Sequence, residues 1–307
     1  MKNYIQKIVF ILLFIYAGLN CNRKEDRITI AIVVKTLNNP FFITLQNEAK
    51  KTAEKYGVNL IVQAPEREID VEKQMQIVEN LIQRKVDAIC ISASGSQQII
   101  PAIVKATRAG IPVLAVDNRI DTAMAAEAGA KIVTYIGSDN EKGGEIAAEY
   151  IIKRLNGRGK VAILEGTPGH ETSIARLKGF LNRIKKEPNI EIVASLTANY
   201  EREQGFNVFQ SILESHQNID ALFACNDMMA LGAIEAIALS GKQGKIVVVG
   251  FDAIEDAKQA IAEGKMDASI AQYPAEMGRL AVEKAIEVIK GNKIPAYIPT
   301  KVELITK

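Results

Sequence analysis

Short apolar runs alternate with longer helical patterns from residue 28 onward, and this alternation limits the possible folds more than any other feature. The runs are apolar on successive residues and rich in Val and Ile, which is typical of parallel strands covered on both faces. Repeated strand–helix units predict a doubly wound α/β architecture. We expect strands at 28–34, 58–63, 88–92, 113–116 and 134–136, and again at 161–164, 190–196, 221–224, 246–250 and 268–271. Helices are expected between them, at 42–56, 70–83, 96–109, 141–155, 172–186 and 205–215.

The chain also contains two versions of one plan. The segment KVDAICIS at 85–92 is echoed by NIDALFACND at 218–227, and AGIPVLAVDN at 109–118 is echoed by GKIVVVGFD at 244–252. The members of each pair are a whole domain apart, whereas a solenoid repeats over a far shorter period. The sequence therefore predicts two similar α/β lobes.

The first residues have the features of a secretory signal. Lys2 and Lys7 flank the start, an apolar run at 8–19 follows, and polar residues come after it. The run is too short for a comfortable membrane span. Cys21 resembles the lipid-acceptor Cys of a bacterial lipobox, although Leu19 lies only two residues before it and Asn20 replaces a small residue. We expect Cys21 to be lipidated; a plainly cleaved signal and an uncleaved anchor are the alternatives.

The other two cysteines, Cys90 and Cys225, lie inside apolar runs. Each is expected to act as a small buried hydrophobic residue, and the two are expected to lie in different lobes. Neither belongs to a CxxC or Cys/His pattern, so we expect no metal site and no cofactor. The net charge of +2 provides no strongly basic surface, which argues against a nucleic-acid partner.

Polar side chains gather where the predicted strands end. In open α/β sheets, ligands bind beyond the carboxyl ends of the strands. Six strand ends, taken from both halves of the chain, present amides, carboxylates or cations at this position. These residues are Lys35 and Asn39, Asp117 and Asn118, Arg176, Asn226 and Asp227, Asp252, and Gln272.

Each of these residues has a plainer interpretation when taken alone. An Asp after a strand commonly caps the next helix, and we expect Asp227 to do so. Asp117 and Asp252 suit turns. Together, however, the groups indicate a sugar site, because carboxylates, amides and guanidinium groups match hydroxyls that both donate and accept. The adjacent rings of Phe41 and Phe42, in KTLNNPFF, offer apolar faces to a sugar ring.

The segments KTLNNPFF, VDN, ACNDMMALGA, VVVGFDA and SIAQYP occur in a recognisable order and spacing. Over nearly its whole length after Arg27, the chain resembles bacterial periplasmic sugar-binding proteins of the ribose/allose/galactose type. The resemblance implies the type I periplasmic-binding fold, with two doubly wound parallel-sheet lobes and a three-stranded hinge that crosses near Ser138, Gln272 and Thr300. The implied domains are a signal and linker at 1–27, an N-terminal lobe at 28–138 plus 273–300, and a C-terminal lobe at 139–272 plus 301–307.

The same resemblance implies which residues contact the sugar. Ribose binders carry Ser where Lys35 stands, whereas an allose-type binder carries Lys, and ribose binders carry Arg where Asn118 stands. A hexose or a polyol therefore fits at least as well as ribose. Tyr200, in TANYEREQG, matches an aromatic family position. The implied ligand-binding residues are Lys35, Asn39, Phe41, Phe42, Asp117 and Asn118 from the N-terminal lobe, and Arg176, Tyr200, Asn226, Asp252 and Gln272 from the C-terminal lobe.

The resemblance implies a monomeric protein that delivers a monosaccharide to an ABC permease, in the periplasm or, through a lipid on Cys21, at the outer face of the cytoplasmic membrane. A sugar-sensing receptor lipoprotein for chemotaxis or a sensor kinase is the alternative. A sugar-responsive repressor would need a helix-turn-helix before residue 28, where the signal lies. We expect no enzyme: neither His170 nor His216 lies in an HExxH motif, and the chain has no GxSxG, P-loop or GxGxxG pattern.

Overall fold

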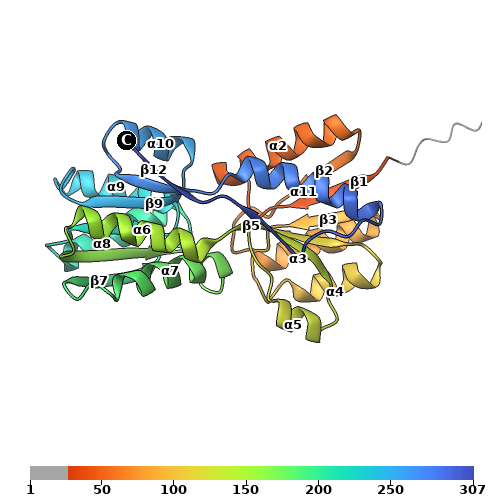
Figure 1. Ribbon diagram of the computed structural model, residues 1–307, viewed down its shortest axis with the longest axis horizontal. Coiled ribbons are helices and arrows are strands. Elements are labelled where there is room, and N and C mark those ends of the chain that lie inside the picture. The colour runs from red at the N-terminus through yellow and green to blue at the C-terminus, as the bar shows by residue number, and fades with distance from the viewer. Residues whose placement is uncertain (1–26) are drawn as a thin grey trace, which may run out of the picture.

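Two α/β lobes lie side by side and are joined by three chain segments in the computed structural model, which describes residues 27–307 (Figure 1). The expected signal segment and its Cys21 lie outside the described residues. Within residues 27–307, none of the helices has both the length and the apolar character needed to span a bilayer.

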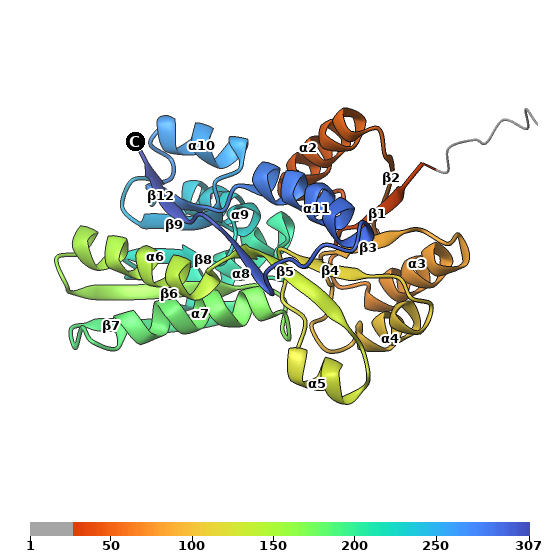
Figure 2. The same ribbon diagram turned by 45° about the vertical axis from the view of Figure 1, so that its right-hand side comes forward.

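The N-terminal lobe is built on a six-stranded parallel sheet whose order is β11-β5-β4-β3-β1-β2. Alternate residues of β1 face opposite sides of this sheet. Ile30 and Ile32 join a core with α2 and α11, which run beside each other in both views (Figure 1, Figure 2), whereas Ala31 and Val33 join a second core with α3 and α4. The elements are β1 (Thr29–Val33), α2 (Pro40–Tyr56), β2 (Asn59–Gln63), α3 (Val71–Gln83), β3 (Ala88–Ile91), α4 (Ile100–Arg108), β4 (Val113–Val116), α5 (Thr122–Glu127), β5 (Ile132–Ser138), α11 (Pro274–Ile289) and β11 (Tyr297–Thr300).

The C-terminal lobe repeats the plan with the order β12-β10-β9-β8-β6-β7, except that β12 runs antiparallel to β10. Phe251 of β9 packs toward α6, and the neighbouring Gly250 faces α9, so these helices cover opposite faces of the sheet. The elements are α6 (Asn140–Arg154), β6 (Gly159–Glu165), α7 (Glu171–Ile184), β7 (Ile190–Thr197), α8 (Arg202–Ser215), β8 (Ala221–Ala224), α9 (Asp227–Leu239), β9 (Val247–Asp252), α10 (Glu255–Ala262), β10 (Ala268–Ala271) and β12 (Glu303–Thr306).

All ten predicted strands are present, and the predicted fold class is confirmed. The edge strands β11 and β12 were not predicted, because both are four residues long and mostly half-exposed, and the first contains Pro299, which is untypical of a strand. Helix α4 begins at Ile100 rather than at residue 96, so residues 96–99 form a turn.

The chain passes from one sheet to the other between β5 and α6, between β10 and α11, and between β11 and β12. A single hydroxyl connects the three passages. Ser138 Oγ shares a hydrogen bond of 2.9 Å with Thr300 Oγ1 and donates to the carbonyl oxygen of Gln272 at 3.4 Å. Tyr273, directly after Gln272, has a left-handed backbone with φ of 62°. The passages therefore form one hydrogen-bonded group beside the space between the lobes.

Candidate ligand-binding site

A cavity lies between the lobes, at the carboxyl ends of their strands. Ten of the eleven residues expected to bind a ligand line it, and two further residues, Glu68 and Thr172, join them. Only Asn118 of the expected set does not. The lining residues are Lys35, Asn39, Phe41, Phe42, Glu68, Asp117, Thr172, Arg176, Tyr200, Asn226, Asp252 and Gln272.

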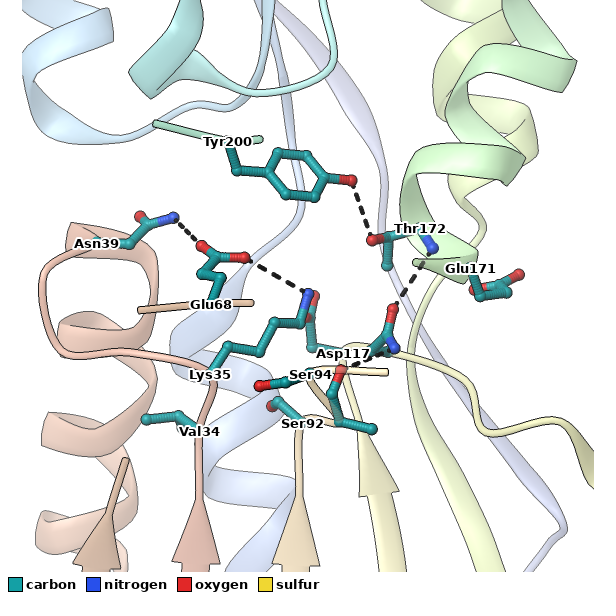
Figure 3. A network of polar contacts seen from close by, with 12 residues as sticks. Val34, Lys35, Asn39, Glu68, Ser92, Ser94, Asp117, Glu171, Thr172 and Tyr200 are labelled. Carbon is teal, nitrogen blue, oxygen red and sulfur yellow. Dashed lines mark hydrogen bonds and ion pairs between the residues drawn. The ribbon is translucent and has the colours of Figure 1, made fainter. Parts of the chain in front are cut away.

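Lys35 supplies a positive charge on the N-terminal side of the cavity. It follows β1, and its side chain is only 4% exposed. The ammonium nitrogen lies 3.5 Å from Asp117 Oδ2 and 3.9 Å from Glu68 Oε2 (Figure 3). Burial raises the pKa of Glu68, and the Lys35 charge works against that rise. Lys35 therefore faces the cavity and two acidic side chains rather than solvent.

The stretch KTLNNPFF turns the chain from β1 into α2 and shapes one wall of the cavity. Asn39 caps the helix, because its Oδ1 accepts a hydrogen bond from the backbone N–H of Phe41 at 3.0 Å. Its Nδ2 donates to Glu68 Oε1 at 3.2 Å (Figure 3). The rings of Phe41 and Phe42 meet edge to face, with centroids 5.2 Å apart, and both side chains are buried. Two neighbouring rings thus share the first turn of the helix, where both reach the cavity and the core.

Arg176 supplies the positive charge on the C-terminal side and is held from several directions. Its Nε donates to Asn140 Oδ1 at 2.8 Å, and its Nη1 donates to the carbonyl oxygen of Cys225 at 2.6 Å. The guanidinium stacks 3.9 Å from the centre of the Phe251 ring. From this fixed position, Nη1 lies 3.5 Å from Asp252 Oδ1.

Asp252 is the most strongly perturbed acid on the cavity wall. Its Oδ1 accepts a hydrogen bond from Gln272 Nε2 at 2.6 Å. Burial raises the pKa of Asp252 to about 7, while Arg176 and the Gln272 amide work against that rise. Gln272 Oε1 is buried and has no hydrogen-bond partner among the described residues. This pair therefore offers acceptor oxygens on both of its side chains to hydroxyl groups in the cavity.

Asn226, rather than Asp227, caps α9, so the prediction for Asp227 is wrong. Asn226 Oδ1 accepts from the N–H of Met229 at 2.9 Å. Asp227 is the first helical residue, and its carboxylate accepts from Ser269 Oγ at 2.7 Å and from the N–H of Ile254 at 2.9 Å. A carboxylate buried this completely is better satisfied by these two donors, one in β10 and one just before α10, than at the end of its own helix.

Three residues that line the cavity have a left-handed backbone. The φ angles are 64° at Asp117, 64° at Tyr200 and 109° at Asp252. Non-glycine residues adopt these values at an energetic cost, and such strain concentrates at functional sites. At Asp117, the hydroxyl of Tyr135 donates to the carbonyl oxygen at 2.9 Å and helps to fix the turn.

Asn118, Glu68 and Thr172 depart from the predicted set. The Asn118 amide is fully buried and donates to the carbonyl oxygen of Ala93 at 3.0 Å, away from the cavity. Glu68 follows β2 by five residues, and a census of strand ends that included β2 would have pointed to this loop. Thr172 shares a hydrogen bond of 3.1 Å with the Tyr200 hydroxyl (Figure 3). Nothing in the local sequence around Thr172 indicates this contact.

Three side chains of types that often react in other proteins, His170, Cys90 and Cys225, do not line the cavity. His170, close to the cavity, has its pKa lowered to about 3 by burial, with the Lys35 charge adding to the effect, so the imidazole stays neutral. Among residues 27–307, no group of three His, Cys, Asp or Glu side chains is arranged to hold a metal ion. Cys90 and Cys225 are both buried free thiols, one in each lobe.

Comparison with known proteins defines the class of this chain. Residues 30–293 match the family model described as periplasmic binding protein domain. The chain is 40% identical over 286 residues to the ribose import binding protein RbsB of Bacillus subtilis strain 168, covering 93% of this chain and 89% of that protein. The protein therefore belongs to the periplasmic binding protein domain family, and the resemblance to its sugar-binding members is confirmed.

Solved structures show the same similarity. An ABC transporter periplasmic solute binding protein from Actinobacillus succinogenes 130z with bound D-allose aligns with a TM-score of 0.86 and 39% identity, covering 91% of this chain and 97% of that one. A solute binding protein from Bacillus halodurans C-125 with bound myo-inositol aligns with a TM-score of 0.82 and 31% identity, covering 91% and 94%. These relatives are transport binding proteins, which confirms the prediction that the chain is not an enzyme.

Proposed function

We propose that this protein captures a neutral monosaccharide or cyclic polyol between its lobes and delivers it to an ABC permease. The observation that carries the proposal is the cavity wall, to which each lobe contributes a cation, an aromatic surface and at least one carboxylate. Charge-assisted hydrogen bonds to hydroxyls and apolar contact with a sugar ring need this combination.

A hexose or an inositol is the preferred ligand over ribose. The relatives named above bind ribose, D-allose and myo-inositol according to their names, so the family alone does not choose among them. Lys35 favours the larger ligands because it brings an ammonium group into the cavity where ribose binders carry a serine. Its three N–H donors serve a hydroxyl that a pentose lacks.

Closure of the two lobes traps the ligand in this mechanism. The lobes are 28–138 plus 273–300 and 139–272 plus 301–307, and the three passages between them act as the hinge. Gln272 links the hinge to the ligand, because its carbonyl oxygen accepts from Ser138 and its side chain donates to Asp252. A ligand that contacts both lobes shifts the population toward the closed form, which the permease then distinguishes from the open one.

The protein acts in the periplasm, as its family does. We extend this location to the outer face of the cytoplasmic membrane through a lipid on Cys21, and we propose that the protein acts there as a monomer. The resemblance of the segment around Cys21 to a lipobox supports the anchor.

A thermal-shift panel tests the proposed function. The purified protein is heated with D-ribose, D-allose, other hexoses, pentoses and myo-inositol at 1 mM. A ligand that binds only the folded form raises the melting temperature by mass action, and a concentration of 100 times Kd adds about 2.7 kcal/mol of stability. We expect the largest shift with D-allose or myo-inositol. Absence of a shift with every sugar and polyol would contradict the proposal.

A further inference from the structure

Helix α7 reaches across the cleft with its N-terminus. His170 occupies the N-cap position of α7 but makes no side-chain hydrogen bond to the helix. Instead, the first two N–H groups of the helix donate to the opposite lobe. The N–H of Glu171 donates to Ser96 Oγ at 3.3 Å, and the N–H of Thr172 donates to Asn118 Oδ1 at 3.4 Å.

The two acceptors are fixed in the N-terminal lobe. Asn118 is fully buried, and its Nδ2 donates to the carbonyl oxygen of Ala93 at 3.0 Å and to Ser96 Oγ at 3.3 Å. These bonds leave Asn118 Oδ1 directed at α7. Side-chain oxygens that accept from the first N–H groups of a helix are the standard stabilisers of its N-terminus. Here they come from the other lobe.

We propose that Asn118 and Ser96 cap α7 in trans and thereby raise ligand affinity by stabilising the closed lobes, without contacting the ligand. The inference rests on the proposed function. Helix α7 carries Thr172 and Arg176, both on the cavity wall, so the same bonds also set the position of two ligand-facing side chains. When the lobes separate, the N–H groups of α7 return to water. The trans cap therefore contributes only to the closed form.

Comparison with α2 supports this role. That helix also follows the first strand of its lobe, but it is capped by its own Asn39, and its capping is independent of lobe position. Asn118 does not line the cavity, whereas Asp117 beside it does. The two neighbouring residues thus have different roles, since Asp117 faces the ligand and Asn118 faces the opposite lobe.

The first test compares the sugar affinity of Ser96→Ala with that of Ser94→Ala. Both serines are buried in the same loop, but Ser94 Oγ has no hydrogen-bond partner among residues 27–307, whereas Ser96 Oγ accepts from α7. Both hydrogen bonds to α7 are long, at 3.3 and 3.4 Å, and therefore weak, so loss of either should raise Kd by about two- to threefold. Calorimetry should show this increase for Ser96→Ala and Asn118→Ala, and no change for Ser94→Ala.

Asn118→Ala should raise Kd by the same factor for every sugar that binds. A residue that contacts the ligand loses affinity selectively, according to the hydroxyl it meets, whereas a trans cap changes only the closing equilibrium. Kd values of Asn118→Ala for D-allose, D-ribose and myo-inositol, each divided by the wild-type value, should therefore agree. Ratios that differ strongly between sugars would overturn the proposal and return Asn118 to the ligand site.

His170→Ser provides the second test, because it gives α7 a cap of its own. A serine at the N-cap accepts from the second or third N–H of the helix, and the second is the Thr172 N–H that Asn118 now receives. In the His170→Ser background, adding Asn118→Ala should change Kd little, so the ratio of the two Kd values should approach one. An undiminished increase would overturn the trans cap.

Hydrogen exchange shows where the effect arises. With saturating ligand, the amide of Thr172 should be protected in the wild type and exposed in Asn118→Ala, while the amides of α9 should stay protected in both. Equal protection in both proteins overturns the proposal. A wild-type protein that binds no sugar refutes the proposed function itself, whereas binding with unchanged variants refutes the trans cap alone.

Discussion

The two halves of the cavity share a plan but differ in how firmly they are built. Each lobe places a carboxylate on a left-handed backbone after an inner strand, Asp117 after β4 and Asp252 at the end of β9. Each also places a cation nearby, Lys35 or Arg176. The similarity follows from the equivalent strand orders of the two sheets, in which β4 and β9 hold the same position.

The cation of the C-terminal half is held more firmly than the cation of the N-terminal half. Arg176 makes hydrogen bonds of 2.8 and 2.6 Å to Asn140 and Cys225 and stacks on Phe251. Lys35 has only carboxylates at 3.5 and 3.9 Å and ring centres at 5.7 Å. Arg176 is therefore preformed, whereas Lys35 has N–H donors left over, which under the proposed function would bind the ligand.

Replacing the cation of each half tests this comparison and should have the largest effect on stability. Arg176→Met leaves Asn140 Oδ1 and the Cys225 carbonyl without their donor and Asp252 without its neighbouring positive charge, so it should reduce the free energy of unfolding by about 3–5 kcal/mol. Lys35→Met should cost less, about 1–3 kcal/mol, because no close hydrogen bond is lost. Urea unfolding of the ligand-free proteins measures both values. Equal losses would show that the two halves are braced alike.

Loss of a carboxylate tests the function of the two halves rather than their stability. Asp117→Ala and Asp252→Ala should both yield folded proteins that bind sugar more weakly by about 3 kcal/mol or more, because two charge-assisted hydrogen bonds disappear. Calorimetry with the best ligand of the panel gives the affinities. Unchanged affinity in either variant would remove that residue from the ligand-binding set.

Much of this comparison could be predicted from sequence. Buried parallel strands appear as continuous apolar runs, and the polar residues directly after them converge in space, which explains why Lys35, Asp117 and Asp252 were found together. Glu68 was missed because its position depends on the path of a loop. The role of Asn118 was missed because its partner Thr172 is 54 residues away in the other lobe. Sequence reasoning reaches positions on strands but not contacts that form when lobes close.

The protonation of Asp252 should make the stability of the protein depend on pH. Its pKa rises from an ordinary 3.8 to about 7 because it is buried. Between about pH 4 and pH 7 the folded protein therefore holds a proton that the unfolded chain has released, so this group's contribution to stability falls as pH rises through that window and levels off above it. Asp252→Asn should lessen the fall. Urea unfolding at pH 5.0 and 7.5 measures the difference, and parallel pH dependence in both proteins would contradict the assignment.

Ligand binding should act on the same proton. Sugar hydroxyls donate to the ionised carboxylate and stabilise it, so binding at pH 6.5 should release protons from the wild type and release fewer from Asp252→Asn. Calorimetry in buffers of different ionisation enthalpy counts these protons. Equal release by both proteins would assign the proton to another group.

Removing the exposed ion pair between the lobes should have the smallest effect on sugar affinity. Arg67 Nη2 and Glu201 Oε1 form an ion pair of 2.9 Å across the cleft, with the Arg67 side chain 50% exposed. Such pairs contribute little and are screened by salt, whereas the buried contacts of α7 with Asn118 are shielded. Arg67→Ala should weaken sugar binding slightly at 20 mM NaCl and not at 500 mM, while the Asn118→Ala effect should persist at both. A large, salt-independent loss in Arg67→Ala would mean that the closed state depends on the rim of the cleft more than on its buried contacts.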